Sequence, residues 1–520
     1  MIETLPSAPA AAEHHVRTTR ERSPWPGLAA LMLIAAVLRL IALDQQLWYD
    51  EMLTLVRSVR LPLGQILTTY TSQNEHLLYS VLARISFNIF GEHIWSLRLP
   101  AVLFGVAAVP ALYFCARLWT TSREAWLACA LLTASYHHVW FSQNARGYTG
   151  MAFWTLLTTY LFVRALREQC VRLWLWYGLA MALGLYTHLT IVFVTVGQFL
   201  AYLWILASPK LPQALGIGAQ RTEATAIVQR PWRPFWGFIA AGILTVLFYA
   251  PILPRVLDKT VGKSAQASVA SEWTNPLWLV LEALKGLAAG AGGAAGFVVL
   301  PVAGIILLAG VLSYWRQDRI AVALMVVPGV LTGGVMLMLE HNLWPRFFFF
   351  AIGFGFLLLM RGAIRTGEWA AAVAGRGSSG LAWGTALALL MIAGSAWSVR
   401  SAWIYPKQDF VGAMQLVDAE HRAGEPVLLG GLGVFPYTRY FQRDWQPVTT
   451  RAEVDAARAA GKRVWLLTTF PIYLKSRHPD VWETLERDFT LVKVFRGTIG
   501  DGEVRVYCWT PPPASAAQQQ

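Results

Sequence analysis

Residues 28–51 have the sequence LAALMLIAAVLRLIALDQQLWYDE, in which a long apolar stretch runs almost directly into two acidic residues. The apolar part approaches the about 20 mostly apolar residues that a helix needs to cross a bilayer. No small-residue cleavage site follows it, and the segment before it is polar and rich in Ala and Arg, so we expect a retained helix rather than a cleaved signal peptide. The sequence therefore predicts a first spanning helix with Asp50 and Glu51 just beyond its outer end.

The composition of the whole chain agrees with a membrane protein. Of 520 residues, 56% are hydrophobic and 14% charged, whereas a soluble protein carries about 25% charged residues. The 24 Trp residues suit broad membrane–water interfaces. The net charge of +13 would suggest nucleic acid in a soluble protein. Here we assign most of it to cytoplasmic loops, with lipid headgroups and phosphates as the expected anions, and expect no nucleic-acid partner.

Apolar stretches predict about eleven spanning helices, at roughly 27–43, 97–117, 125–142, 150–166, 173–187, 189–207, 236–253, 296–314, 320–338, 347–361 and 381–398. Only Thr187 and His188 separate the fifth from the sixth. Lys and Arg gather in every second loop, which predicts a cytoplasmic N-terminus and, with eleven spans, an outer C-terminal segment.

The sequence predicts four parts: a cytoplasmic tail over 1–26, a membrane domain over 27–400, an outer α/β domain over 401–510 and a disordered tail over 511–520. Two outer loops, at about 44–95 and 254–295, interrupt the membrane domain, and 52–59 and 77–90 are amphipathic enough for interfacial helices. Short apolar runs at 427–429, 464–468, 491–495 and 504–509 alternate with helical patterns, as in an α/β fold. The fold class is thus a polytopic α-helical membrane protein with a small C-terminal α/β domain.

Polar clusters collect on the outer side of the predicted membrane. Asp50 and Glu51 come first, and a carboxylate in such a low-dielectric place can act as a general base toward a hydroxyl. The alternative is an acidic helix end, with Trp48 and Tyr49 as interface anchors. The other clusters lie on the same predicted side of the membrane. They contain His76 with Tyr79 in the first outer loop, Arg98 before Leu99-Pro100 at the start of the second span, Arg146 with Tyr148 at the outer end of the third, and Arg346 after Pro345 at the outer end of the ninth.

These motifs, in this order among the spans, resemble those of the GT-C glycosyltransferases, in particular the protein O-mannosyltransferase and lipid A aminoarabinose transferase branch. The resemblance covers about 28–361. It implies transfer of a hexose or pentose from a polyprenyl-phosphate donor to a glycan, lipid or protein acceptor on the outer face of a cell (inner) membrane. It also implies that Asp50 is the catalytic base, that Glu51 assists it by supporting the acceptor or the loop, and that Arg346 lies near the donor phosphate. With Arg346, it makes five further residues candidates for binding the donor phosphate or the substrate: His76, Tyr79, Arg98, Arg146 and Tyr148. His76 is followed by Leu77-Leu78 where the family often has prolines, which leaves its role open.

The implied chemistry is consistent with the residue types. A polyprenyl phosphate is a good leaving group, so fixed positive charge from Arg is what the leaving side needs. A carboxylate on the opposite face would activate the acceptor and invert the anomeric carbon. No Gly-rich nucleotide loop is evident, and no cofactor is expected. Asp50, Glu51 and His76 leave a loose divalent-cation site as an open alternative.

Other residues carry more ordinary expectations. We expect Arg39, inside the first span, to extend toward the interface, with contact to a phosphate as the alternative. His137 and His138 are adjacent, so they do not share a helix face, and we expect packing or hydrogen bonding from them and from His188 rather than metal binding. Trp344 and Phe347–Phe350 are expected to face lipid or the interface rather than to form a platform for a sugar.

Three other functions stay open from the residues. The first is a transporter or flippase of lipid-linked sugars, although the repeats and broken helices typical of transporters are not evident. The second is an outer-face polysaccharide ligase or polymerase. The third is an assembly subunit in which the acidic pair is incidental.

Overall fold

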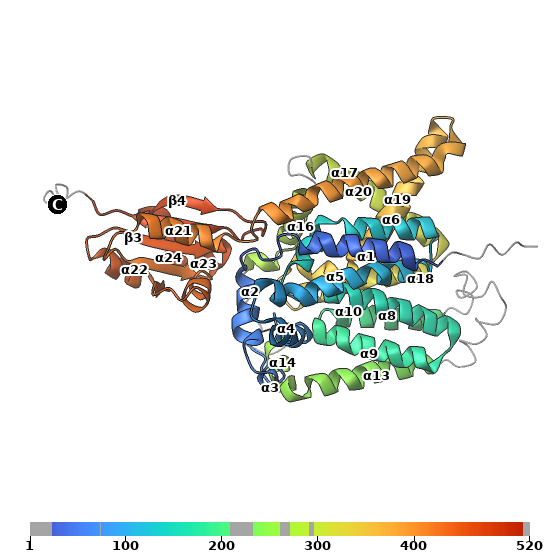
Figure 1. Ribbon diagram of the computed structural model, residues 1–520, viewed down its shortest axis with the longest axis horizontal. Helices are drawn as coiled ribbons and strands as arrows, with labels where there is room; N and C mark the ends of the chain where they lie inside the picture. The colour runs from blue at the N-terminus through green and yellow to red at the C-terminus, as the bar shows by residue number, and fades with distance from the viewer. Residues whose placement is uncertain (1–22, 73, 208–231, 261–270, 291–295, 513–520) are drawn as a thin grey trace, which may run out of the picture.

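The computed structural model describes residues 23–72, 74–207, 232–260, 271–290 and 296–512. The predicted tails over 1–26 and 511–520 lie largely outside the described residues. Figure 1 shows a helical bundle with a small mixed sheet domain at one of its ends.

Each predicted span falls on a helix or a helix pair. These are α1 (Trp25–Leu40), α5 (Ile94–Ala116), α6 (Ser122–Thr133) with α7 (Tyr136–Ser142), α8 (Tyr148–Glu168), α9 (Val171–Thr187), α10 (Ile191–Ala207), α13 (Arg233–Tyr249), α17 (Gly296–Gln317), α18 (Arg319–Met338), α19 (Ile352–Val373) and α20 (Gly380–Ile404). Among the described residues, 6 helical stretches are long and apolar enough to cross a membrane by length and composition. The chain is a polytopic α-helical membrane protein, as its hydropathy predicted.

Shorter elements lie at the end of the bundle that faces the sheet domain, where Figure 1 places α2, α3, α4 and α14. The first outer loop forms α2 (Tyr49–Thr54), the π-helix η1 (Leu55–Val59), α3 (Leu63–Ile66) and α4 (Leu77–Phe90). The second contributes η2 (Ala250–Ile252), α14 (Leu253–Thr260), η3 (Ser271–Thr274) and α16 (Pro276–Gly290), and the 3-10 helix η5 (Pro345–Ala351) precedes α19. The predicted helices at 52–59 and 77–90 are therefore confirmed.

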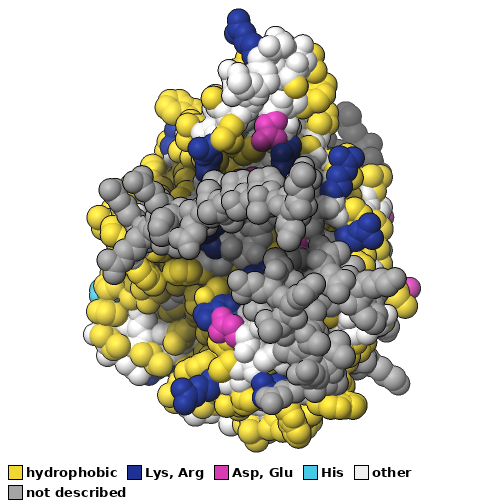
Figure 2. Space-filling view, turned by 90° about the vertical axis from the view of Figure 1, so that its right-hand side faces the viewer, with side chains coloured by type: hydrophobic (Ala, Val, Ile, Leu, Met, Phe, Trp, Pro, Cys, Tyr) yellow, Lys and Arg dark blue, Asp and Glu magenta, His cyan; other side chains and the backbone are white. Residues whose placement is uncertain are grey.

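The end of the bundle that lies away from the sheet domain carries the loops that are rich in Lys and Arg. Figure 2 views this end and shows Lys and Arg side chains spread around its rim, with few acidic ones among them. These are the loops that the sequence predicts to be cytoplasmic, and the orientation itself stays a prediction.

The third span is broken between α6 and α7, and Arg39 of α1 fills the break. Its guanidinium donates to the Thr133 carbonyl at 3.2 Å and to the Ser142 hydroxyl at 3.1 Å, and lies 2.7 Å from His138 Nδ1. The side chain is fully buried. The prediction that Arg39 extends to the interface is wrong, because the freed carbonyls of the break satisfy it inside the bundle; the hydrogen-bonding role expected of His138 is confirmed.

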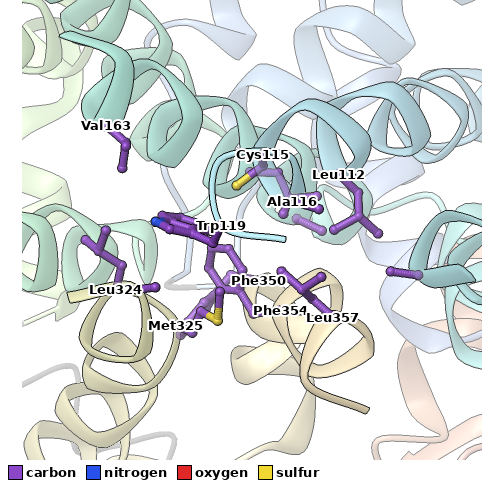
Figure 3. Close-up of a cluster of buried hydrophobic side chains, with 14 of the residues drawn as sticks. Leu112, Cys115, Ala116, Trp119, Val163, Leu324, Met325, Phe350, Phe354 and Leu357 are labelled. Carbon is purple, nitrogen blue, oxygen red and sulfur yellow. The ribbon is translucent and has the colours of Figure 1, made fainter. Parts of the chain in front are cut away.

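The main core of the bundle includes aromatic residues from the stretch that was expected to face lipid. Figure 3 shows Phe350 and Phe354 among Trp119, Met325 and Leu357. Phe349 is 6% exposed and Phe350 is fully buried. The lipid-facing prediction is therefore wrong for these two phenylalanines, because η5 turns its side chains inward before α19 begins.

Two helices of the bundle cross at glycines. A Cβ at Gly310 of α17 would lie 2.0 Å from the Leu358 carbonyl oxygen, and one at Gly362 of α19 would lie 1.8 Å from the Ile306 carbonyl oxygen. Such approaches exclude any side chain, so these glycines let the backbones pack together as small residues do in membrane helices.

The C-terminal domain is a five-stranded sheet in the order β2-β1-β3-β5-β4. Its strands are β1 (Val427–Gly431), β2 (Gln446–Val448), β3 (Val464–Thr469), β4 (Thr490–Phe495) and β5 (Val504–Trp509). Its helices are α21 (Phe410–Glu420), α22 (Arg451–Arg458), α23 (Pro471–Arg477) and α24 (Pro479–Asp488), with the π-helix η7 (Pro436–Tyr440); η6 (Gly377–Ser379) precedes α20. β1 pairs parallel with β2 and β3, and Leu429 faces Leu467 in the register. All of β3 is buried, as expected for a central strand covered on both faces. The predicted α/β fold is confirmed.

Candidate active site

The acidic pair lies in the first turn of the short helix α2. Trp48 precedes the helix in an extended conformation, and the Glu51 carboxylate accepts the Trp48 N–H at 3.4 Å, which closes the first turn. Because successive residues of a helix point in different directions, the two carboxylates diverge. Asp50 faces a cavity, whereas Glu51 faces the protein interior.

Asp50 meets Arg346 across the cavity wall. The Asp50 Oδ2 lies 3.4 Å from the Arg346 Nη1, and the two side chains are 6% and 17% exposed. Arg346 follows Pro345, which opens η5, and its guanidinium lies over the Trp344 ring at 4.6 Å and the Trp48 ring at 5.8 Å. Two residues far apart in sequence thus place a carboxylate and a guanidinium in one site.

The cavity has a volume of about 620 Å³. Asp50 and Arg346 line it, together with the partly exposed Trp344 and Phe347, which were expected to face lipid or the interface. Its wall also includes apolar residues of α10 and α18, namely Val192, Phe193, Val335 and Met336. Lys259 and His341 add further basic groups. The cavity is therefore amphipathic, with charge at one part and hydrocarbon-like lining at another.

Glu51 is locked to Arg98 in the interior. Arg98 donates to both carboxylate oxygens, at 2.7 and 2.6 Å, and the Ala145 N–H donates to Oε1 at 2.6 Å. Both side chains are fully buried. Burial raises the pKa of the Glu51 carboxyl, but the charges of Arg98 and Lys407 and these hydrogen bonds outweigh it, so the pKa lies below its usual value. This geometry suits a structural clamp within the loop, and Glu51 is not among the described residues that line the cavity.

Arg146 joins three segments behind the cavity. Its guanidinium donates to the Thr54 hydroxyl at 3.0 Å and to the Asn74 side chain, and lies 3.1 Å from His76 Nε2. His76 Nδ1 accepts the Gly147 N–H at 2.7 Å. Burial, and then the charge of Arg146, lowers the pKa of His76 well below its usual value, so the imidazole is neutral at pH 7.

The remaining predicted site residues support these clusters. The Tyr148 ring lies edge-on to His76, with centroids 5.0 Å apart. The Tyr79 hydroxyl donates to the Leu97 carbonyl at 2.5 Å, beside Arg98. All eight predicted residues therefore gather at one end of the bundle, but of these eight only Asp50 and Arg346 line the cavity within the part of the chain that the structure describes.

The sequence analysis missed the residue that ties α2 to the sheet domain. Gln408 accepts the Tyr49 N–H at 2.9 Å and donates to the Thr469 hydroxyl at 3.1 Å and to the Gly502 carbonyl at 2.8 Å. It is fully buried. Its neighbour Lys407 is also buried, and that burial, followed by the charge of Arg98, lowers the pKa of the Lys407 ammonium to about 7.

Residues of the C-terminal domain form part of the cavity wall, and the sequence did not single them out. Leu432 follows β1, Phe470 follows β3, and Tyr473 lies in the first turn of α23. Phe470 has a φ of 53°, a left-handed conformation that is uncommon for a non-glycine residue. The one available signal was the Phe470-Pro471 pair directly after a buried strand, since parallel strands present their carboxyl ends to ligands.

Metal binding has no support in the described geometry. Within the residues that the structure describes, no group of three or more His, Cys, Asp or Glu side chains could hold a metal ion. The loose site imagined for Asp50, Glu51 and His76 is not assembled, because Glu51 is engaged with Arg98 and His76 with Arg146.

The chain is similar to a family of mannosyltransferases and to curated arabinosyl transferases. Residues 75–215 match the family model described as dolichyl-phosphate-mannose-protein mannosyltransferase. An undecaprenyl phosphate-alpha-4-amino-4-deoxy-L-arabinose arabinosyl transferase of Pseudomonas aeruginosa (strain LESB58) is 27% identical over 242 residues, which are 37% of this chain and 41% of that relative. The corresponding protein of strain UCBPP-PA14 is 26% identical over the same length. The chain thus spans about two fifths of the length of these relatives.

The resemblance to the GT-C membrane glycosyltransferases is confirmed.

Solved structures of the same kind resemble the chain over most of its length. A crystal structure of ArnT from Cupriavidus metallidurans bound to undecaprenyl phosphate has 14% identity and a TM-score of 0.45, and covers 94% of this chain and 100% of that one. An Archaeoglobus fulgidus oligosaccharyltransferase has 11% identity and a TM-score of 0.48, and covers 92% and 74%. The matched GT-C family segment contains His76, Arg98 and Arg146, whereas Asp50 and Arg346 lie outside it.

Proposed function

We propose that this protein is a membrane glycosyltransferase that moves a sugar from a polyprenyl-phosphate donor to an acceptor hydroxyl on the extracytoplasmic face. The observation that carries the proposal is the pairing of Asp50 and Arg346, 3.4 Å apart, in one cavity. An always-ionised guanidinium suits the donor phosphate, and a nearby carboxylate suits a general base. The curated relative named undecaprenyl phosphate-alpha-4-amino-4-deoxy-L-arabinose arabinosyl transferase supports the same class of donor.

The cavity fits both ends of such a donor. Arg346 would hold the phosphate oxygens and stabilise the charge that develops on them as the glycosidic bond breaks. The apolar lining from α10 and α18, which includes Val192 and Val335, would receive the start of the polyprenyl chain.

The chemistry follows from these positions. Asp50 would take the proton of the acceptor hydroxyl, whose oxygen then bonds to the anomeric carbon. The bond from that carbon to the phosphate oxygen breaks, and polyprenyl phosphate leaves with both bonding electrons. Attack from the face opposite the phosphate inverts the anomeric carbon.

In the ligand-free site Asp50 pairs with Arg346, so the two must part before the reaction. The donor is a phosphodiester with one negative charge, and its two non-bridging oxygens can compete with the Asp50 carboxylate for both arms of the Arg346 guanidinium. Donor binding would therefore release Asp50 toward the acceptor, which makes the base available only when the sugar is present.

The parts of the chain take the following places in this proposal. Residues 27–400 form the membrane domain in a cell (inner) membrane, with the segment 1–26 in the cytoplasm. The outer loops at about 44–95 and 254–295 and the domain at 401–510 cover the cavity from outside.

The test is sugar transfer by the purified protein. It is incubated with undecaprenyl phosphates that each carry one radiolabelled sugar, together with lipid, glycan and protein fractions of bacterial envelopes. We expect label to move from the polyprenyl lipid to an acceptor, and Asp50→Asn to reduce transfer at least about 100-fold, within the range of general-base catalysis. Asp44→Asn, which changes an exposed carboxylate of the same loop, should keep wild-type activity.

Two results would count against the proposal. Full transfer by Asp50→Asn would remove Asp50 as the base. Label that crosses proteoliposomes while still bonded to polyprenyl phosphate, with none on any acceptor, would indicate a transporter instead.

A further inference from the structure

A wall of aromatic side chains extends from Arg346 toward the C-terminal domain. The Arg346 guanidinium lies 4.6 Å from the Trp344 ring centroid, and the Trp344 and Trp273 rings are 4.9 Å apart. Beyond them, Tyr473 of α23 is stacked on Trp273 at 6.3 Å, with 28° between the planes. Trp273, Trp344 and Tyr473 all line the cavity.

This wall is held together across the sequence. The Leu343 N–H donates to the Trp273 carbonyl at 2.8 Å, which joins η3 to the loop that carries Asn342 and Trp344. Trp273 is 5% exposed, so its indole is fixed rather than free to rotate into water. The rings are therefore preorganised, which reduces the entropy that a ligand must lose on binding.

Several buried polar atoms of cavity residues have no hydrogen-bond partner among the described residues. They are the Trp273 Nε1, the Asn342 Oδ1, the Arg346 Nε and the Asp50 Oδ2. Buried polar groups in proteins are almost always paired, so these four, among 19 such atoms in the described residues, are candidates for pairing with a ligand of the cavity. Two of the four are donors and two are acceptors.

A sugar ring can make both the apolar contacts and the hydrogen bonds that these cavity residues offer. Its C–H faces pack on aromatic rings, and each of its hydroxyls can accept from an N–H and donate to an amide or carboxylate oxygen. The sugar is bonded directly to the phosphate, so a phosphate bound by Arg346 would place the sugar beside the neighbouring rings of Trp344 and Trp273.

We infer that Trp273 and Asn342 are the specificity residues for the donor sugar, with Tyr473 of the C-terminal domain stacked behind the indole. This inference rests on the proposed function and deepens it. The indole N–H donates to one sugar hydroxyl and the Asn342 amide oxygen accepts from another. Since both contacts are made to the sugar and not to the phosphate, they distinguish one donor from another.

The test compares donors that differ in the sugar alone. Wild type, Trp273→Phe and Asn342→Ala are assayed with undecaprenyl phosphates carrying mannose, glucose, galactose or 4-amino-4-deoxyarabinose. Trp273→Phe keeps an aromatic ring and removes the N–H. We expect kcat/KM for the best donor to fall about tenfold in each variant, consistent with the loss of one hydrogen bond, and the preference among donors to narrow.

A second measurement separates recognition of the sugar from general damage. Inhibition by undecaprenyl phosphate without a sugar should stay within about twofold of wild type in both variants. The control is Trp278→Phe, which changes a tryptophan that packs on Trp344 at 5.1 Å but is not among the described residues that line the cavity. It should leave both the rate and the preference unchanged.

The outcomes distinguish the two levels of the proposal. If wild type transfers no sugar from any donor, the proposed function fails and the inference fails with it. If wild type transfers sugar and Trp273→Phe keeps the same rate and donor preference, the inference alone is overturned. Equal loss of affinity for the sugar-free lipid would overturn it as well, and a changed preference among acceptors instead of donors would place the subsite on the acceptor.

Discussion

Replacement of the two adjacent acids should give opposite results, and Glu51→Gln is the more revealing change. The Glu51 carboxylate accepts two hydrogen bonds from Arg98 and one from the Ala145 N–H, all between 2.6 and 2.7 Å. Glutamine would place an NH2 group where one oxygen accepts, so a donor would face a donor. The Arg98 charge would stay buried without its counter-ion.

The expected loss in the free energy of unfolding follows from the burial of the Glu51–Arg98 pair. Both side chains are 0% exposed, and breaking a buried pair by removing one partner costs about 3–5 kcal/mol. Asp50→Asn differs, because the ion pair with Arg346 borders the cavity and its 3.4 Å separation includes no hydrogen bond. We expect that change to cost less than Glu51→Gln, because the Arg346 side chain is 17% exposed and can be hydrated from the cavity.

The assay is an equilibrium unfolding titration of the purified variants in one detergent, followed by Trp fluorescence. Glu92→Gln serves as the matched control, because it removes the carboxylate from an ion pair with Arg60 that is 40% and 50% exposed, and should cost less than about 1 kcal/mol. Sugar transfer is measured on the same samples, with Asp50→Asn expected to be stable and inactive. A Glu51→Gln variant as stable as wild type, or one no less stable than Asp50→Asn, would refute the assignment of Glu51 as a structural clamp.

Three further changes follow from the geometry. Arg346→Ala should raise the KM for the donor at least about tenfold while the KM for the acceptor changes little, and an unchanged donor KM would remove the phosphate role. Gly310→Ala should lower the unfolding temperature because its methyl would meet a backbone carbonyl at 2.0 Å, whereas Gly304→Ala on the same helix, with open space around it, should not; equal stabilities would disprove the close crossing. Lys407 has a pKa of about 7 in the folded protein and about 10.4 when unfolded, so between these pH values the ammonium is protonated only in the unfolded chain. As the pH rises through this range, the contribution of Lys407 to the free energy of unfolding increases by up to about 1.4 kcal/mol per pH unit. Lys407→Met should remove that part of the rise when titrations at pH 7, 8 and 9 are compared, and an identical pH dependence would contradict the burial of the charge.

The spans and the sheet strands were predictable because each follows from local pattern. A helix in a bilayer needs a long apolar stretch, so hydropathy alone locates α5 or α18, and short apolar runs separated by polar helices locate β1 and β3. Asp50 and Arg346 were identifiable because a carboxylate and a guanidinium stand out at the outer ends of apolar segments.

The predictions that were wrong, and the site residues that were missed, concern side chains whose partners are distant in the sequence. Arg39 lies in an apolar stretch, and nothing nearby shows that a break in another helix supplies the Thr133 carbonyl. Phe350 has the composition of a lipid-facing residue, and only the inward turn of η5 buries it. Tyr473 belongs to another domain, so its place in the cavity wall depends on tertiary packing that no local pattern encodes.

The carboxyl ends of β1 and β3 carry Leu432 and Phe470 to the cavity on short connections. In open α/β sheets this edge is where variation changes binding and leaves the scaffold intact. Exchange of these two connections would therefore change the range of ligands that the cavity accepts. The membrane helices and the Asp50–Arg346 pair would stay the same. If the proposed sugar transfer is correct, libraries confined to the two connections would alter the sugars or acceptors used without any change to the membrane helices.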